Sequence, residues 1–142
     1  KKVDWQMKGI LMYLIDTDII IWTIRQGRGN KVVWQAIDSF FRSQPDEVAI
    51  STITVAEIYK NIRSSEVSDT EKILAKHAIV PVSIEIAKSA GYYWQQYNQK
   101  IKTLSLPDCI IAATSQIEKA KLLTLNSRHF PMKDIEVLNP LS

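Results

Sequence analysis

The sequence predicts an α/β protein built around a short, mostly parallel sheet. Apolar runs rich in β-branched residues alternate along the chain with segments of helical period, which is typical of strand and helix units in series. No Pro/Gly-rich linker, low-complexity tract or internal repeat interrupts the 142 residues. Hydrophobic residues make up 46% and charged residues 23%, a composition typical of a folded globular protein, and the length suits one hydrophobic core. We therefore expect a single domain over residues 1–142.

Two strands and two intervening helices are predicted in the first third of the chain. The strand "LMYLID" at residues 11–16 leads into the helix "IIIWTIRQG", which should end near Gly27 because glycine often follows a helix. A second helix, "KVVWQAIDSFFRSQ", has apolar residues at helical spacing and is closed by Pro45. The run "EVAIS" is the second strand.

Four helices and three strands are predicted in the remainder. The helix "STITVAEIYKNIRSS" has Glu57 in its second turn, and the helix "SDTEKILAKHA" takes Ser68 or Asp69 as its cap. The strand "IVPVS" contains Pro81, which favours an edge position. The helices "IEIAKSAGYYWQQYNQK" and "LPDCIIAATSQIEKA" then precede the last strands, "KLLTLN" and "IEVLNP", which flank the short turn "SRHF".

Charge and hydropathy narrow the class of protein. A net charge of +3 permits a nucleic-acid partner without requiring one. Asp16 and Asp18 interrupt the longest apolar run, so we expect no membrane span; with no signal-peptide pattern either, we expect a cytoplasmic protein. The single cysteine, Cys109, lies in an apolar segment and is expected in the core.

Polar residues gather where predicted strands meet helices. Asp16 and Asp18 end the first strand, Glu57 lies in the helix after the second, Asp108 opens a helix, and Asn126 ends the fourth strand. The carboxyl ends of parallel strands share one crevice, so these side chains are expected to converge. Carboxylates gathered without basic partners repel one another, and a hard cation such as Mg²⁺ or Mn²⁺ removes that cost.

Each acid also has an ordinary structural explanation. Asp108 lies in the first turn of its predicted helix, where capping alone would account for it. Glu57 on its own is equally well explained as a solvent-facing helix residue. Asp18 is better placed than Asp16 to cap the helix that follows, so we interpret Asp16 as the ligand and Asp18 as a cap or a supporting residue.

Four segments in order resemble the PIN domain, and specifically the VapC-like toxins of bacterial toxin–antitoxin pairs: "YLIDTDIIIW", "ISTITVAEIYKNIR", "SLPDCIIAATS" and "LLTLNSRHF". The resemblance runs from about Met12 to Pro140, which leaves residues 1–11 as an N-terminal extension. It implies a Rossmann-like α/β/α sandwich, metal-dependent ribonuclease activity on RNA, a small antitoxin partner and a homodimer.

The resemblance also assigns the polar residues. Asp16 matches the first family acid, Glu57 the acid of the "T-x-x-E" helix, and Asp108 the acid that precedes "hIAA". Asp18 stands where the family often has Asn or Asp. Asn126 occupies a position that carries a fourth acid in many relatives. We therefore expect Mg²⁺ or Mn²⁺ to be held by Asp16, Asp108 and Glu57, with the Asn126 amide as a fourth member of the site.

In this interpretation Glu57 holds the attacking water or accepts its proton. Two rival functions remain open. A catalytically weak PIN-like module that binds RNA or a protein is favoured by the missing fourth acid. A phosphotransfer domain would need a lysine after a core strand, and we see none. Exposed cations that could contact RNA phosphates are Lys100, Lys102 and Arg128.

Large apolar side chains are more numerous on three early helices than one narrow face requires. They could form a hydrophobic groove for an antitoxin peptide, or they could equally be core. The residues are Trp22, Phe40, Phe41, Tyr59 and Ile62.

Overall fold

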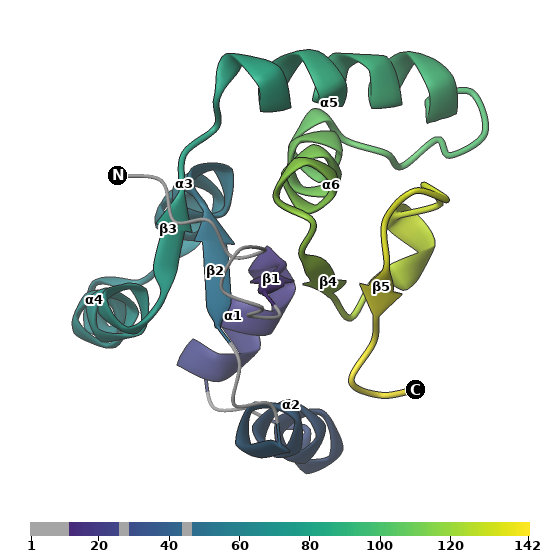
Figure 1. The fold of residues 1–142 in the computed structure, drawn as a ribbon. Helices are drawn as coiled ribbons and strands as arrows, with labels where there is room; N and C mark the ends of the chain where they lie inside the picture. The colour runs from purple at the N-terminus through teal and green to yellow at the C-terminus, as the bar shows by residue number, and fades with distance from the viewer. Residues whose placement is uncertain (1–11, 26–28, 44–46) are drawn as a thin grey trace.

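Five strands form one parallel sheet in the computed structural model, which describes residues 12–25, 29–43 and 47–142. The N-terminal extension (1–11), Gly27 and Pro45 lie outside the described residues. The order across the sheet is β3-β2-β1-β4-β5 (Figure 1). The strands are β1 (Tyr13–Ile15), β2 (Val48–Ser51), β3 (Ala78–Val80), β4 (Lys121–Leu123) and β5 (Val137–Leu138).

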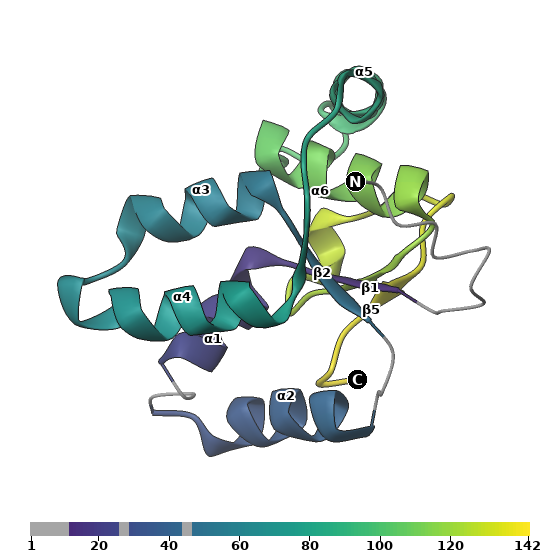
Figure 2. The ribbon, with the colours of Figure 1, turned by 60° about the vertical axis from the view of Figure 1, so that its left-hand side comes forward.

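Helices cover both faces of this sheet, as Figures 1 and 2 show from two sides. The predicted α/β/α sandwich is therefore confirmed. The helices are α1 (Thr17–Ile24), α2 (Lys31–Ser43), α3 (Thr52–Asn61), α4 (Val67–Lys76), α5 (Ile84–Tyr97) and α6 (Leu106–Glu118), and two short 3-10 turns are η1 (Ser64–Glu66) and η2 (Ser127–His129).

The central strand β1 sends alternate side chains into two separate cores. Leu14 packs with residues of α5 and α6 on one face, whereas Tyr13 and Ile15 pack with residues of α1 and α2 on the other. This alternation follows from the two-residue period of a strand, and each fully buried aliphatic side chain stabilises the fold by about 1.5–3 kcal/mol. Asp16 thus directly follows a fully buried strand at the centre of the sheet.

Several predicted boundaries are wrong, and two of them concern residues named as a site member or a helix cap. The strand β4 ends at Leu123, so Asn126 lies three residues beyond it. The helix α4 begins at Val67, which places Ser68 and Asp69 inside its first turn instead of at its cap. The cause is Glu66, whose side chain accepts the backbone N–H of Arg63 at 2.9 Å and thereby winds η1 directly into α4.

Other sequence predictions are confirmed. β3 is an edge strand that ends immediately before Pro81, and Cys109 is fully buried as a free thiol. Of the five large apolar residues that could be groove or core, Tyr59 is 43% exposed. The other four pack half-buried against the core that contains α1 and α2, namely Trp22, Phe40, Phe41 and Ile62. Among the described residues, no helix combines the length and apolarity that crossing a bilayer requires.

Candidate active site

The strand order reverses next to β1, and Asp16 directly follows this strand. β1 lies between β2 and β4, the place where ligands bind in open α/β sheets, outside the carboxyl ends of the strands. Asp16 is buried and is the N-cap of α1, since its Oδ1 accepts the N–H of Thr17 at 2.8 Å. Its Oδ2 accepts the hydroxyl of Thr124 at 2.7 Å. The prediction that Asp18 caps this helix is therefore wrong.

Asp18 instead ties the first turn of α1 to the segment after β4. Its Oδ2 accepts the backbone N–H of Leu125 at 3.2 Å and the side-chain amide of Asn126 at 3.0 Å. Its other oxygen, Oδ1, is buried and has no hydrogen-bond partner among the described residues. Asn126 thus uses its amide to hold a carboxylate of the same site.

Asp108 is fixed at the N-terminus of α6 by a capping box. Its backbone N–H donates to Ser105 Oγ at 3.1 Å, and the backbone N–H of Ser105 donates to Asp108 Oδ2 at 3.3 Å. His129 Nδ1 lies 3.8 Å from the same oxygen, Oδ2, so η2 flanks this carboxylate. The capping explanation for Asp108 is correct. The capping bond uses Oδ2 and does not use the other carboxylate oxygen, Oδ1.

Glu57 reaches the site through a hydroxyl that the sequence analysis did not single out. Thr17 Oγ1 donates to Glu57 Oε1 at 2.7 Å, which joins α3 to the residue immediately after Asp16. Thr124 was also overlooked, although its buried hydroxyl contacts Asp16. The only signals in the sequence were Thr17 between Asp16 and Asp18 and Thr124 two residues before Asn126, and threonine is too common for such a signal to be specific.

Burial and mutual repulsion shift the carboxyl groups toward the protonated form. Desolvation raises the pKa of Asp16 to about 7, with repulsion from Asp18 as the next cause. Desolvation likewise raises the pKa of Asp18 to about 6. The charge of Asp108 raises both pKa values slightly further, so Asp108 lies within electrostatic reach of the other two carboxyl groups. Such a cluster is costly unless a cation accompanies it.

The side-chain oxygens at this site suit a hard cation that keeps several of its waters better than a cation enclosed entirely by protein ligands. Within the described ranges, no three side chains of Asp, Glu, His or Cys are placed to enclose a metal ion. Mg²⁺, however, usually keeps several waters and takes only one or two carboxylates. Asp16 and Asp108 supply such carboxylates.

Comparison with known proteins identifies the family. The profile of the PIN domain matches residues 13–135. The chain belongs to the PIN-domain family. This PIN domain is 32% identical over 130 residues to ribonuclease VapC10 of Mycobacterium tuberculosis, a match that covers 91% of the chain and 92% of the relative. Ribonuclease VapC19 of the same organism is 30% identical and covers 85% of the chain and 94% of the relative.

Solved structures agree with the family. A toxin–antitoxin complex from Klebsiella pneumoniae contains a chain that is 28% identical to this PIN domain, with a TM-score of 0.69 and coverage of 90% of this chain and 97% of that one. A chain of the DNA-bound VapBC from Salmonella typhimurium shares the fold at a TM-score of 0.75, with 20% identity and coverage of 92% and 99%. The resemblance to VapC-like PIN domains is thus confirmed.

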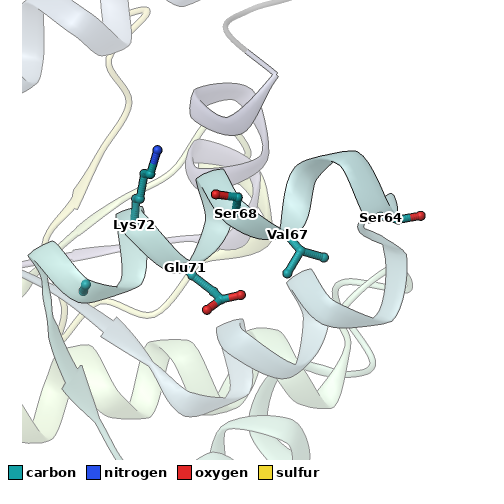
Figure 3. A pocket seen from close by; sticks show the side chains of 6 residues that line it. Ser64, Val67, Ser68, Glu71 and Lys72 are labelled. Atoms are coloured by element: carbon teal, nitrogen blue, oxygen red, sulfur yellow. The ribbon is translucent and has the colours of Figure 1, made fainter.

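The PIN domain also has an open surface pocket on η1 and α4, away from the carboxylates. Figure 3 shows Glu71 and Lys72 extending in opposite directions from α4, so the polar groups of this pocket do not converge on one point. Its lining residues are Ser64, Val67, Ser68, Glu71, Lys72 and Ala75. The pocket therefore gives no competing candidate for the active site.

Proposed function

We propose that this PIN domain is an endoribonuclease toxin that hydrolyses RNA phosphodiester bonds with the help of Mg²⁺ or Mn²⁺. One observation carries the proposal. Asp16 directly follows the central strand β1 and lies within electrostatic reach of Asp108, in a chain that is 32% identical to ribonuclease VapC10 over 91% of its length. Hydrolysis of a phosphodiester needs charge stabilisation and an activated water, and this edge of the sheet offers carboxylates for both tasks.

Asp16 and Asp108 would hold the cation through the oxygens that their capping hydrogen bonds leave available. When bound, the cation would acidify a water and offset negative charge on the scissile phosphate. Glu57 accepts the proton of the attacking water in this scheme. Because its Oε1 is engaged by Thr17 at 2.7 Å, Oε2 is the oxygen that takes this proton.

Basic residues beside Asp108 would bind the RNA backbone. Lys100 and Lys102 lie exposed in the segment between α5 and α6, and Arg128 lies exposed in η2. The two segments meet where Thr103 Oγ1 lies 3.5 Å from His129 Nε2. Contacts of this kind carry little sequence information and weaken with salt, so RNA binding should fall as ionic strength rises.

A small antitoxin and a second copy of the chain are the proposed protein partners. The antitoxin is supported by the 28% identical chain in the toxin–antitoxin complex from Klebsiella pneumoniae, and the second copy is an expectation from the family resemblance alone. Tyr59 on α3, 43% exposed, offers apolar surface that an antitoxin peptide could cover.

One observation favours a second candidate function, a catalytically weak module that binds RNA or protein. Among the described residues, no three metal-ligating side chains are placed to enclose an ion, and the side-chain amide of Asn126 donates to Asp18. A PIN domain with this site could bind RNA through Lys100, Lys102 and Arg128 without cutting it.

Cleavage of total RNA separates the two candidates. The reaction is run with Mg²⁺, with Mn²⁺ and with EDTA, for the wild-type protein, Asp16→Asn, Asp108→Asn and the control Asp38→Asn on the exposed face of α2. We expect cleavage only with a divalent cation, and only in the wild type and the control. Cleavage that survives EDTA and both site substitutions would overturn the metal-dependent mechanism. RNA that is bound but intact under every condition would favour the binding module.

A further inference from the structure

His129 lies beside Asp108 with each of its ring nitrogens close to a protein oxygen. Its Nδ1 is 3.8 Å from Asp108 Oδ2, and its Nε2 is 3.5 Å from Thr103 Oγ1. One contact is to the first turn of α6, and the other is to the segment that precedes α6. The two contacts together fix where the imidazole ring lies.

The backbone that carries this ring is held as well. His129 is the last residue of η2, and its N–H donates to the carbonyl of Asn126 at 3.0 Å. The next residue, Phe130, is buried in the core that contains α5 and α6. The side chain of His129 is nevertheless 37% exposed. A ligand can therefore reach this ring, and little conformational entropy is lost when it binds.

The surroundings of the two nitrogens limit what the ring offers to a ligand. Whichever nitrogen carries the proton, each one already faces an oxygen of the protein. In the described part of the chain, no cluster of three Asp, Glu, His or Cys side chains includes this ring as a metal ligand. What remains is the π face, and unstacked nucleobases of RNA bind to the faces of histidine and aromatic side chains.

A large apolar side chain is exposed within the capping box that holds Asp108. Leu106 lies between Ser105, the N-cap of α6, and Asp108, and it is 52% exposed. The capping bonds involve only Ser105 and Asp108, so they give no reason for a leucine at this position. Single exposed leucines are ordinary on protein surfaces, but this one lies in the same helical turn as the carboxylate that His129 contacts.

We propose that His129 and Leu106 form a base-binding surface, on which an unstacked nucleobase next to the scissile phosphate rests. The imidazole stacks on the base, and Leu106 supplies an apolar contact. This inference rests on the proposed function. Contacts from Lys100, Lys102 and Arg128 to phosphates carry no base preference, so the ring is the group that contacts the base itself. A purine offers a larger π face than a pyrimidine, and RNA with a purine at this position should bind more tightly.

RNA binding in EDTA tests this surface apart from any cleavage. Fluorescence anisotropy compares two probes of equal length: oligoadenylate, and a chain of abasic ribose phosphates that keeps the charge and lacks the bases. His129→Phe keeps a ring face and removes both nitrogens, whereas His129→Gln keeps polar atoms and removes the ring. Leu106→Ala removes the apolar contact, and Leu141→Ala, at a position that is 48% exposed, is its matched control. Melting temperatures report the folding of each variant.

We expect the wild type to bind oligoadenylate at least about fivefold more tightly than the abasic chain, which is the lower end of what one stacked base contributes. His129→Phe should keep this preference, and His129→Gln should lose most of it. Leu106→Ala should reduce the preference by a smaller factor, while Leu141→Ala should leave it unchanged. In RNA cleavage, His129→Gln should raise KM more than it lowers kcat, since the stacked base is bound in the ground state and in the transition state alike.

The outcomes separate this surface from the function on which it rests. Equal binding of the two probes by the wild type, or an unchanged preference in His129→Gln, would overturn the base-binding surface. Loss of the preference in His129→Phe would attribute the effect to the ring nitrogens and would overturn stacking. Leu106→Ala that behaves like Leu141→Ala would remove Leu106 from the surface. Intact RNA under every condition with the wild type would overturn the nuclease function, and the two probes would still decide whether bases bind here.

Discussion

The hydroxyl of Thr17 donates to Glu57 Oε1 at 2.7 Å and thereby joins α1 to α3 across 40 residues of sequence. Thr17 immediately follows Asp16, whose carboxylate accepts the Thr17 backbone N–H. One residue therefore fixes two of the proposed catalytic carboxylates relative to each other, one through its backbone and one through its side chain. This arrangement gives the middle residue of "DTD" a defined task.

Replacing Thr17 by valine should slow RNA cleavage about tenfold, the usual cost of losing a residue that orients a ligand or base. Valine keeps the shape of threonine and removes the donor, so Glu57 loses its fixed orientation while α1 stays intact. Single-turnover cleavage rates measure the effect. Thr17→Ser retains a hydroxyl and should keep most of the rate; equal rates for the valine and wild-type proteins would remove Thr17 from the site.

Asp16→Asn should abolish cleavage and at the same time stabilise the metal-free protein. Asparagine is also a good N-cap, so the bond from the Thr17 N–H can persist. Burial and repulsion penalise the charged form of Asp16, and the substitution removes that penalty, which we expect to be worth on the order of 2 kcal/mol near neutral pH. Chemical denaturation in EDTA measures it. A clear loss of stability would show that the carboxylate is structural.

The stability difference between Asp16→Asn and the wild type should depend on pH. The pKa of Asp16 is raised from 3.8 to about 7 in the folded protein, so between these values the folded state binds more protons than the unfolded state. The contribution of Asp16 to stability therefore falls as pH rises through this window. Melting temperatures in EDTA should differ most near pH 7.5 and converge near pH 4. A difference independent of pH would contradict the buried, uncompensated charge.

The features of this molecule that could be predicted from the sequence are those that depend on residues close together in the chain. The edge position of β3 followed from Pro81, and the first-turn placement of Asp108 followed from the residues around Pro107. The cap of α1 was predicted wrongly, as Asp18 instead of Asp16, because either residue, judged locally, is a good N-cap. Asp18 is held instead by Leu125 and Asn126, more than a hundred residues away, and no local pattern reports such contacts.

The ion pair between Arg25 and Glu66 should stabilise the fold without affecting catalysis. Glu66 Oε2 accepts Arg25 Nε at 3.0 Å, which joins the end of α1 to η1. Hydrogen bonds from Arg25 and from the Arg63 backbone lower the pKa of Glu66 to about 2, so its contribution is present above pH 4.5 and is lost as pH falls toward 2.

Glu66→Gln should therefore lower the melting temperature by a few degrees at pH 7 and by less at pH 3. The exposed pair of Asp38 and Arg42, 2.8 Å apart on α2, gives the control, because such surface pairs contribute little. Asp38→Asn should leave the melting temperature nearly unchanged. If the Glu66→Gln protein were as stable as this control at pH 7, the ion pair between Arg25 and Glu66 would contribute no more to stability than an exposed surface pair.

A polar chain holds α5 against α6 and the segment after η2. Tyr93 donates its hydroxyl to Asp134 Oδ1 at 2.8 Å, Gln116 donates to the other oxygen of Asp134 at 2.7 Å, and Ser89 donates to Gln116 Oε1 at 2.8 Å. Burial and the bond to Asp134 raise the pKa of Tyr93, so the phenol stays a donor throughout the neutral range. This chain of bonds lies outside the carboxylate site.

Tyr93→Phe should accordingly destabilise the protein by about 1 kcal/mol, the net value of one such hydrogen bond, and leave the RNA cleavage rate unchanged. The ring itself remains packed between the helices, so only the hydroxyl is lost. Tyr92 is 69% exposed on the adjacent position of α5, and Tyr92→Phe is therefore the matched control with no expected loss. Denaturant unfolding and cleavage are measured on both variants. Slower cleavage by a Tyr93→Phe protein of wild-type stability would contradict both expectations. It would indicate that the contact between α5 and α6 helps to position Asp108.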